Sequence, residues 1–162
     1  MTDGSVKSKL TAIFGAITKA YKALKEGPEE AYQPVSGKEG GEHDNKAADQ
    51  FDRGVKEFKK GNFWGAIDNF KWAARLVPGN GRYWSYLSLA YSKIEGRLKD
   101  AEEALLTAIK LEPFNADYHV NLGLIYLKAG AKMRAKSSFE KALEIEPGNE
   151  KAKKALRQAA GK

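Results

Sequence analysis

Three prolines at nearly equal spacing constrain the fold of this chain more than any other feature. Pro78, Pro113 and Pro147 stand 35 and 34 residues apart and close the similar segments KWAARLVPGN, LTAIKLEPFN and KALEIEPGN. Small and large side chains recur in register before each proline, in the sets Ala66/Ala101/Ala135, Phe70/Leu105/Phe139 and Ala73/Ala108/Ala142. An internal repeat near 34 residues is typical of stacked helix pairs. The spacing therefore predicts an all-α fold built from repeated units.

The recurring residues resemble the tetratricopeptide repeat, whose pattern runs W-x2-L-G-x2-Y…A-x3-F…P. The resemblance covers residues 47–149, in units at 47–80, 81–115 and 116–149. It implies an α-solenoid of three helix–turn–helix units that binds another protein. We expect paired helices at 47–60 and 63–76, 81–94 and 98–111, and 116–129 and 132–145.

Small residues mark where the two helices of each unit should cross. Gly54, Ser88 and Gly123 share one register in the first helices. They should face the small residues of the second helices, which are Ala66, Ala101 and Ala135. Helices approach to about 8 Å only where no large side chain stands between them. Pro78, Pro113 and Pro147 should end each second helix and direct the chain into the next unit.

The segments that flank the repeats have patterns of their own. In residues 1–26, apolar residues recur at spacings of three and four, which predicts an amphipathic helix at 6–25. Residues 27–46 are rich in glycine, proline and acids, and we expect a flexible acidic linker there. Residues 150–162 should form a capping helix and tail, because the last packing face of a solenoid needs a polar cover.

Composition argues against catalysis. The 162 residues include no cysteine and two histidines, His43 and His119, and neither histidine stands in a nucleophile–base or metal-ligand spacing. We therefore expect no enzyme activity, no metal and no cofactor. The sequence also lacks an apolar run of membrane-span length. Together with the missing cysteines, this favours a cytoplasmic location.

The resemblance implies a binding surface on the concave side of the repeats, which the first helices line. Apolar residues not needed between the units should form a trough with a polar margin, suited to an extended peptide or an amphipathic helix. We expect this trough to be lined by Phe51, Val55, Phe58, Arg82, Ser85, Leu89, Lys93, Val120, Leu124, Leu127 and Lys128. The indicated function is that of an adaptor or assembly scaffold.

Some proteins with this repeat clamp the C-terminal carboxylate of heat-shock chaperones through Lys, Asn and Arg at set positions. The matching positions here are Phe51, Val55, Tyr86, Asp117 and Asn121. One of the five has a compatible residue type, and the carboxylate of Asp117 would repel a second carboxylate. We therefore expect a peptide partner but no carboxylate clamp.

The helix expected at 6–25 has several interpretations. Its apolar stripe could dock in the trough of its own chain and occlude it, or in that of a neighbour and form a homodimer. Its basic flanks would also suit a membrane surface. In addition, residues 10–32 resemble the end of a J-domain. The matching residues are Ala20, Tyr21, Leu24, Pro28 and Tyr32, whereas the His-Pro-Asp tripeptide of J-domains is absent.

Two alternative functions stay open at this stage. The J-domain resemblance implies the C-terminal, repeat-containing part of a co-chaperone. The net charge of +7, with Lys151, Lys153 and Lys154 near the end of the chain, would suit nucleic acid or an anionic membrane. No nucleic-acid-binding motif accompanies these lysines.

Overall fold

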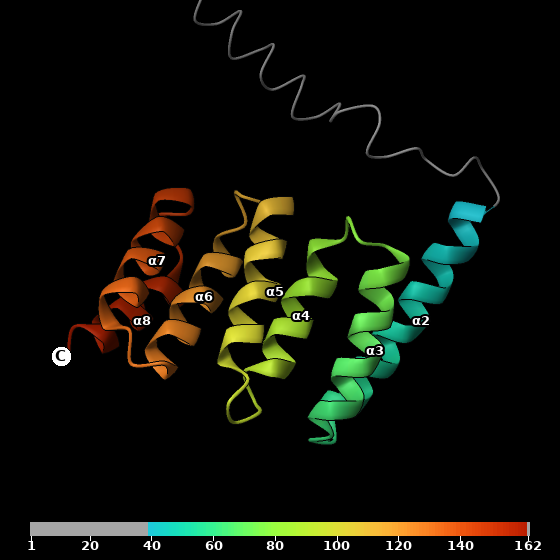
Figure 1. Cartoon of the computed structure of the whole chain (residues 1–162). Coiled ribbons are helices and arrows are strands. Elements are labelled where there is room, and N and C mark those ends of the chain that lie inside the picture. The colour runs from blue at the N-terminus through green and yellow to red at the C-terminus, as the bar shows by residue number, and fades with distance from the viewer. Residues whose placement is uncertain (1–38, 162) are drawn as a thin grey trace, which may run out of the picture. The chain divides into compact units, whose positions relative to one another are not determined.

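The computed structural model describes residues 39–161, which form seven α-helices and no strand within that range. The helices are α2 (Glu39–Lys59), α3 (Phe63–Leu76), α4 (Gly81–Tyr91), α5 (Leu98–Leu111), α6 (Ala116–Lys128), α7 (Lys132–Ile145) and α8 (Glu150–Ala159). They stand side by side in chain order (Figure 1). The all-α prediction is confirmed. The amphipathic helix expected at 6–25, with its homodimer, and the J-domain-like segment at 10–32 lie outside the described residues.

The helices form three antiparallel pairs, α2/α3, α4/α5 and α6/α7, which correspond to the three predicted units. The second helix of each pair contacts the first helix of the next pair, in the contacts α3–α4 and α5–α6. Helix α8 contacts α7 and α6 in the same way, so it takes the place of the first helix of a fourth unit. Its Ala152 and Ala155 are buried. The solenoid prediction therefore holds for the described residues, and α8 covers the last packing face.

The start of α2 corrects one expected boundary. The helix begins at Glu39 rather than at residue 47, so the last part of the expected linker at 27–46 is helical. Lys46 Nζ donates to Glu42 Oε1 at 2.6 Å across one helical turn. This bond, followed by the charge of Lys46, lowers the pKa of Glu42. A carboxylate near a helix N-terminus also interacts favourably with the helix dipole, so both contacts favour helix in a segment whose glycines had suggested a linker.

Glycines in two of the first helices allow the helices of a pair to pack closely. A Cβ atom at Gly54 would lie 2.5 Å from Cε1 of Phe70, and one at Gly123 would be closer still to Phe139. Both rings are fully buried. The phenylalanine rings of the second helices therefore pack directly against the glycine backbone of the first helices. The sequence had predicted only alanines at this crossing.

The middle pair solves the same crossing with different residues. Ser88 takes the register of the two glycines, and its Oγ donates to the carbonyl oxygen of Ala101 at 2.6 Å. Leu105 stands in the register of the two phenylalanines and is fully buried. The larger residue in the first helix thus accompanies a smaller one in the second.

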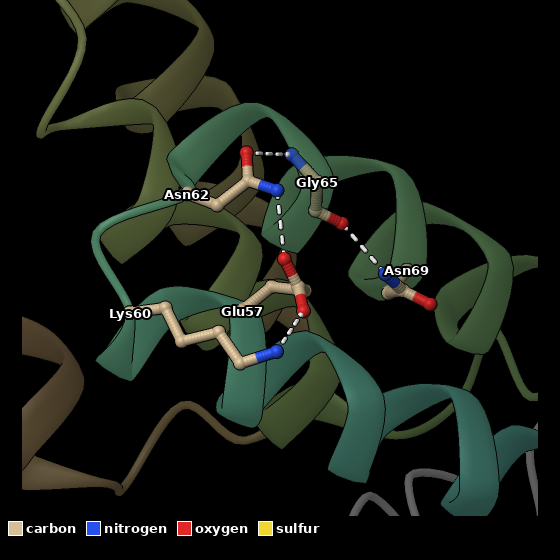
Figure 2. A network of polar contacts seen from close by, with 5 residues as sticks. All are labelled: Glu57, Lys60, Asn62, Gly65 and Asn69. Carbon is tan, nitrogen blue, oxygen red and sulfur yellow. Dashed lines mark hydrogen bonds and ion pairs between the residues drawn. The ribbon is translucent and has the colours of Figure 1, made fainter.

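Glycines with positive φ angles form the turns inside the pairs, and an asparagine caps the helix that follows the first of these turns. Gly61, Gly96 and Gly130 have φ angles of 80°, 77° and 76°, a backbone region that favours glycine. After Gly61, the Asn62 side chain accepts a hydrogen bond from the Gly65 amide at 3.1 Å and caps the start of α3 (Figure 2).

The same asparagine ties α3 to the end of α2. Asn62 Nδ2 donates to Glu57 Oε2 at 2.7 Å, and Lys60 Nζ donates to Glu57 Oε1 at 2.9 Å (Figure 2). The bonds from Lys60 and then Asn62 lower the pKa of Glu57. Asn69 Nδ2 donates to the Gly65 carbonyl at 2.7 Å one turn further along α3. The turn is therefore held by Lys60 and Asn62, which both bond to Glu57 of α2.

The turns between the pairs each contain one of the three repeated prolines. Helices α3, α5 and α7 end two residues before these prolines, as predicted. Trp84 Nε1 donates to the Pro78 carbonyl at 2.9 Å, and His119 Nε2 is 3.2 Å from the Pro113 carbonyl in the same register. Because a carbonyl oxygen can only accept, His119 carries its proton on Nε2 in this contact. His119 thus holds a turn.

The first and second pairs are joined by aromatic rings. The ring of Phe51 in α2 lies 5.5 Å from that of Phe70, 5.1 Å from that of Tyr83 and 4.8 Å from that of Tyr86, measured between centroids. Such distances are typical of favourable aromatic pairs. The contact between these pairs is therefore mainly apolar.

The second and third pairs are joined by a polar cluster, which consists of Glu102, Tyr126 and Arg134. The Tyr126 hydroxyl donates to Glu102 Oε1 at 2.8 Å, and Arg134 Nη2 donates to the same oxygen at 2.5 Å and to the Tyr126 hydroxyl at 2.8 Å. The guanidinium also lies 4.0 Å from the centroid of the Tyr126 ring. Burial, followed by the bond to Glu102, raises the pKa of Tyr126. One cluster therefore connects α5, α6 and α7.

The close crossing of α2 and α3 predicts a large effect from a single methyl group. Gly54→Ala should lower the free energy of unfolding by about 1–3 kcal/mol, because Phe70 must move to admit the new Cβ. Urea unfolding followed by circular dichroism measures this change. Gly41→Ala is the matched control, since Gly41 also lies in α2 and a Cβ there meets nothing within 4 Å. Equal losses in the two variants would contradict this account of the crossing.

Candidate peptide-binding groove

A pocket of about 190 Å³ lies between α4 and α6. It is lined by Ser85, Ser88, Leu89, Ser92, Lys93, Asn121, Leu124, Ile125 and Lys128. The first five belong to α4 and the turn that follows it, and the last four belong to α6. The pocket therefore lies between the first helices of neighbouring pairs, on the side where the trough was predicted.

Two leucines in the same repeat register line the apolar part of the pocket. Leu89 is 40 % exposed and Leu124 is 45 % exposed, although both are large apolar side chains. Ser88 and Ile125 also line the pocket, and both are buried. The pocket can therefore take an apolar side chain and shield it from water.

Two lysines, also in one register, make the polar margin positive. Lys128 Nζ donates to the backbone carbonyl of Ser92, which connects α6 to the end of α4. Lys93 forms no ion pair with any residue of the described range 39–161. No carboxylate is among the lining residues that the structure describes. Carboxylates or backbone carbonyls of a ligand would thus meet donors at this margin.

Five of the eleven residues expected in the trough line this pocket. They are Ser85, Leu89, Lys93, Leu124 and Lys128. Ser92 and Asn121 complete its polar lining. Ser88 was expected only at the helix crossing, and Ile125 was not expected at the site. Both residues are direct sequence neighbours of the two leucines, and this adjacency could have predicted them.

The other residues expected in the trough do not line the pocket. For two of them, Phe51 and Val120, the expected exposure to a ligand was wrong. Phe51 is 5 % exposed because its ring packs among Phe70, Tyr83 and Tyr86, and Val120 is buried in the same apolar core. Neither can offer a surface to a ligand in this conformation.

The remaining expected residues lie at the edges of the core. Val55, Phe58 and Leu127 are half-buried and pack against the core. The Phe58 ring lies 5.3 Å from that of Phe63. The Arg82 guanidinium lies 4.8 Å from the centroid of the Phe51 ring and covers it. The structure therefore brings together the part of the trough formed by the second and third pairs, and does not bring in the part expected from α2.

Two of the lysines of α8 lie beside carboxylates. Lys151 Nζ lies 3.2 Å from Asp117 Oδ1, and Lys153 Nζ lies 2.8 Å from Glu150 Oε1. Two of the three lysines considered for nucleic acid or lipid binding are thus paired with carboxylates. Exposed pairs of this kind contribute little to stability, but they reduce the local positive charge.

From Glu39 to Gly161, no helix is both long and apolar enough to cross a lipid bilayer. Over the same stretch, no group of three or more His, Asp or Glu side chains is placed to hold a metal ion.

Comparison with known families agrees with this geometry. A family profile described as TPR repeat matches residues 93–130, and a second, described as Tetratricopeptide repeat, matches residues 116–149. This chain is a tetratricopeptide repeat protein. The matched residues include α6 and all four pocket-lining residues of that helix.

The chain is similar to the Hsp70-Hsp90 organizing protein of Triticum aestivum, at 32 % identity over 107 residues. It is also 29 % identical over 83 residues to the Protein O-mannosyl-transferase TMTC3 of Homo sapiens. The matches cover 66 % and 51 % of this chain but 18 % and 9 % of those proteins. The chain therefore spans a small part of the length of either relative.

A solved structure shows the same fold. The first TPR of Spaghetti (RPAP3), bound to the HSP90 peptide SRMEEVD, superposes with a TM-score of 0.68 at 25 % identity. The alignment covers 73 % of this chain and 93 % of that domain. A domain of related fold is thus seen bound to a peptide.

Proposed function

We propose that the pocket between α4 and α6 binds a peptide segment of another protein, and that the chain acts as an adaptor or assembly scaffold without enzyme activity. The pair of exposed leucines, Leu89 and Leu124, carries this proposal. Large apolar side chains that stay exposed beside a hollow are typical of surfaces that bind another molecule. The relatives support the proposal, because a related domain holds a peptide.

The lining defines the chemistry of the peptide. An apolar side chain of the ligand would enter between Leu89 and Leu124. An acidic group or a backbone carbonyl beside it would accept hydrogen bonds from Lys93 and Asn121. A single small pocket supports a modest affinity, with a Kd on the order of micromolar.

Leu89 tests the role of the apolar part of the pocket. Peptides selected from a random library on the full chain should lose at least about tenfold in affinity on Leu89→Asp, because the carboxylate would sit in the apolar part of the pocket and cost about 1–3 kcal/mol. Fluorescence anisotropy with a labelled selected peptide measures the Kd.

Leu111→Asp is the matched control for that experiment. Leu111 is 40 % exposed, like Leu89, but it lies at the end of α5 and does not line the pocket. The control should bind the selected peptide as the unchanged chain does. Selected peptides that tolerate Leu89→Asp and are lost on Leu111→Asp would place the binding surface elsewhere.

A second prediction addresses peptides of the chaperone type. We propose that recognition does not depend on a C-terminal carboxylate, since the matching positions include the buried Phe51 and the acidic Asp117. The peptide SRMEEVD and the same peptide with a C-terminal amide should therefore differ by less than about twofold in Kd, well under the factor of ten that 1.4 kcal/mol represents. Isothermal titration calorimetry tests this. A preference of more than about tenfold for the free acid would show that a carboxylate clamp exists.

A third prediction concerns residues 6–25. We propose that their apolar stripe competes with the peptide for the pocket when no partner is present. Because α2 begins at Glu39, removal of residues 1–38 leaves all described helices intact. The shortened chain should bind the selected peptide more tightly, by about threefold or more, since occupied pockets lower the apparent affinity. An unchanged Kd would contradict the competition.

A further inference from the structure

Helix α3 exposes two tryptophans that neither the repeat fold nor the pocket uses. Trp64 is 56 % exposed and Trp72 is 60 % exposed. Asp68 and Arg75 are also exposed, and with the tryptophans they form an outward stripe, because positions 64, 68, 72 and 75 recur at spacings of four and three. We call these four residues the α3 stripe. Exposed aromatic residues at helical spacing indicate a docking surface.

The α3 stripe is a special property of the first pair. The same register in α5 holds Lys99, Glu103, Thr107 and Lys110, and in α7 it holds Met133, Ser137, Lys141 and Glu144. Neither helix has an aromatic residue there, although both have the same place within their pairs. The repeat fold therefore does not require aromatic residues at these positions.

Charged side chains of neighbouring residues flank the stripe, since Arg75 lines a hollow together with Asp100 and Glu103 of α5. The Lys71 ammonium lies 5.7 Å from the centroid of the Tyr91 ring and is thus directed toward α4. The Arg97 guanidinium lies 5.6 Å from the Trp64 ring, at one end of the stripe. Within residues 39–161, Asp68 and Arg75 form no ion pair.

The order of charges along the stripe makes it complementary to itself. Asp68 lies four residues before Trp72, and Arg75 lies three residues after it. With a rise of about 1.5 Å per residue, the two charges stand about 5 Å on either side of a point next to Trp72. A two-fold axis through that point would bring each aspartate opposite an arginine.

We propose that the chain forms a homodimer through α3, with the two α3 helices antiparallel about this axis. Asp68 pairs with Arg75 of the partner subunit, and Arg75 pairs with Asp68 of the partner subunit. The two Trp72 side chains meet next to the axis. Trp64 reaches the turn of the partner subunit at Gly79, where nothing lies within 4 Å of a Cβ position.

Charge selects a second copy over other occupants of the stripe. A membrane surface would favour an excess of basic residues, whereas the centre of this stripe carries one acid and one base. A partner surface of a single charge sign would be attracted by one of these two groups and repelled by the other. A second copy satisfies both groups at once.

The contact is small, so the dimer is weak. A tryptophan buries at most about 150–250 Å², and the four partly exposed tryptophans of a dimer stay well below the roughly 1,200 Å² of stable complexes. We expect a reversible dimer with a Kd on the order of 100 µM. The stripe is distinct from the pocket between α4 and α6, so the two surfaces can be tested separately.

Exchanged charges test the proposed symmetry in the full chain. Asp68→Arg alone and Arg75→Asp alone should each weaken the dimer by about tenfold, because each change creates two like-charge contacts across the axis. The double variant, Asp68→Arg with Arg75→Asp, should dimerise like the unchanged chain. An equimolar mixture of the two single variants should also restore dimers. Sedimentation equilibrium at low salt, up to about 0.5 mM, measures each Kd.

Controls separate this contact from other modes of association. The exchanged residues are exposed, so circular dichroism should show unchanged helix content in every variant. Trp72→Ala should weaken the dimer by about tenfold or more. A monomer throughout this concentration range, a double variant as weak as the single ones, or a Trp72→Ala dimer of full strength would each overturn the proposal. The last result would also follow if the N-terminal segment were the dimer contact.

Discussion

The close crossing between the two helices of each pair determines most of this structure. At Gly54 and Gly123 the first helix has no Cβ, and the phenylalanine ring of the second helix lies directly on its backbone. The pair is thereby brought together on one side, and its other residues are turned either toward the next pair or to solvent. Ser88 shows that the constraint concerns total volume rather than glycine itself, because a serine is accepted where leucine replaces phenylalanine.

The turns carry this local geometry from one pair to the next. Trp84 and His119 each bond the proline carbonyl six residues before them, so α4 and α6 start in the same orientation. Equivalent positions in the two helices consequently face the same side. Leu89 and Leu124 share one register and Lys93 and Lys128 share another, which is why leucines flank one pocket and lysines form its margin. The lining of the pocket is thus a consequence of the repeat period.

The sequence predicts this structure well where a feature recurs and less well where it occurs once. The helix pairs and the proline turns recur with the period, and their places agree with the structure. Phe51 was expected in the trough by register, but it meets three aromatic rings that the repeat pattern does not specify. Helix α2 starts early, at Glu39, in a segment whose composition favours a linker, and Glu42 and Lys46 are paired there. The tryptophans of α3 have no counterpart in the other pairs, so the repeat pattern contains no information about them.

The two junctions between pairs should differ in mechanical stiffness. Directional hydrogen bonds from Arg134 and Tyr126 resist sliding, since a shift of about 1 Å would break their geometry. Aromatic rings around Phe51 tolerate small offsets, because stacked and tilted arrangements have similar energies. Bending would then concentrate between α3 and α4. The first pair would rotate relative to the others, while the pocket between α4 and α6 keeps its width.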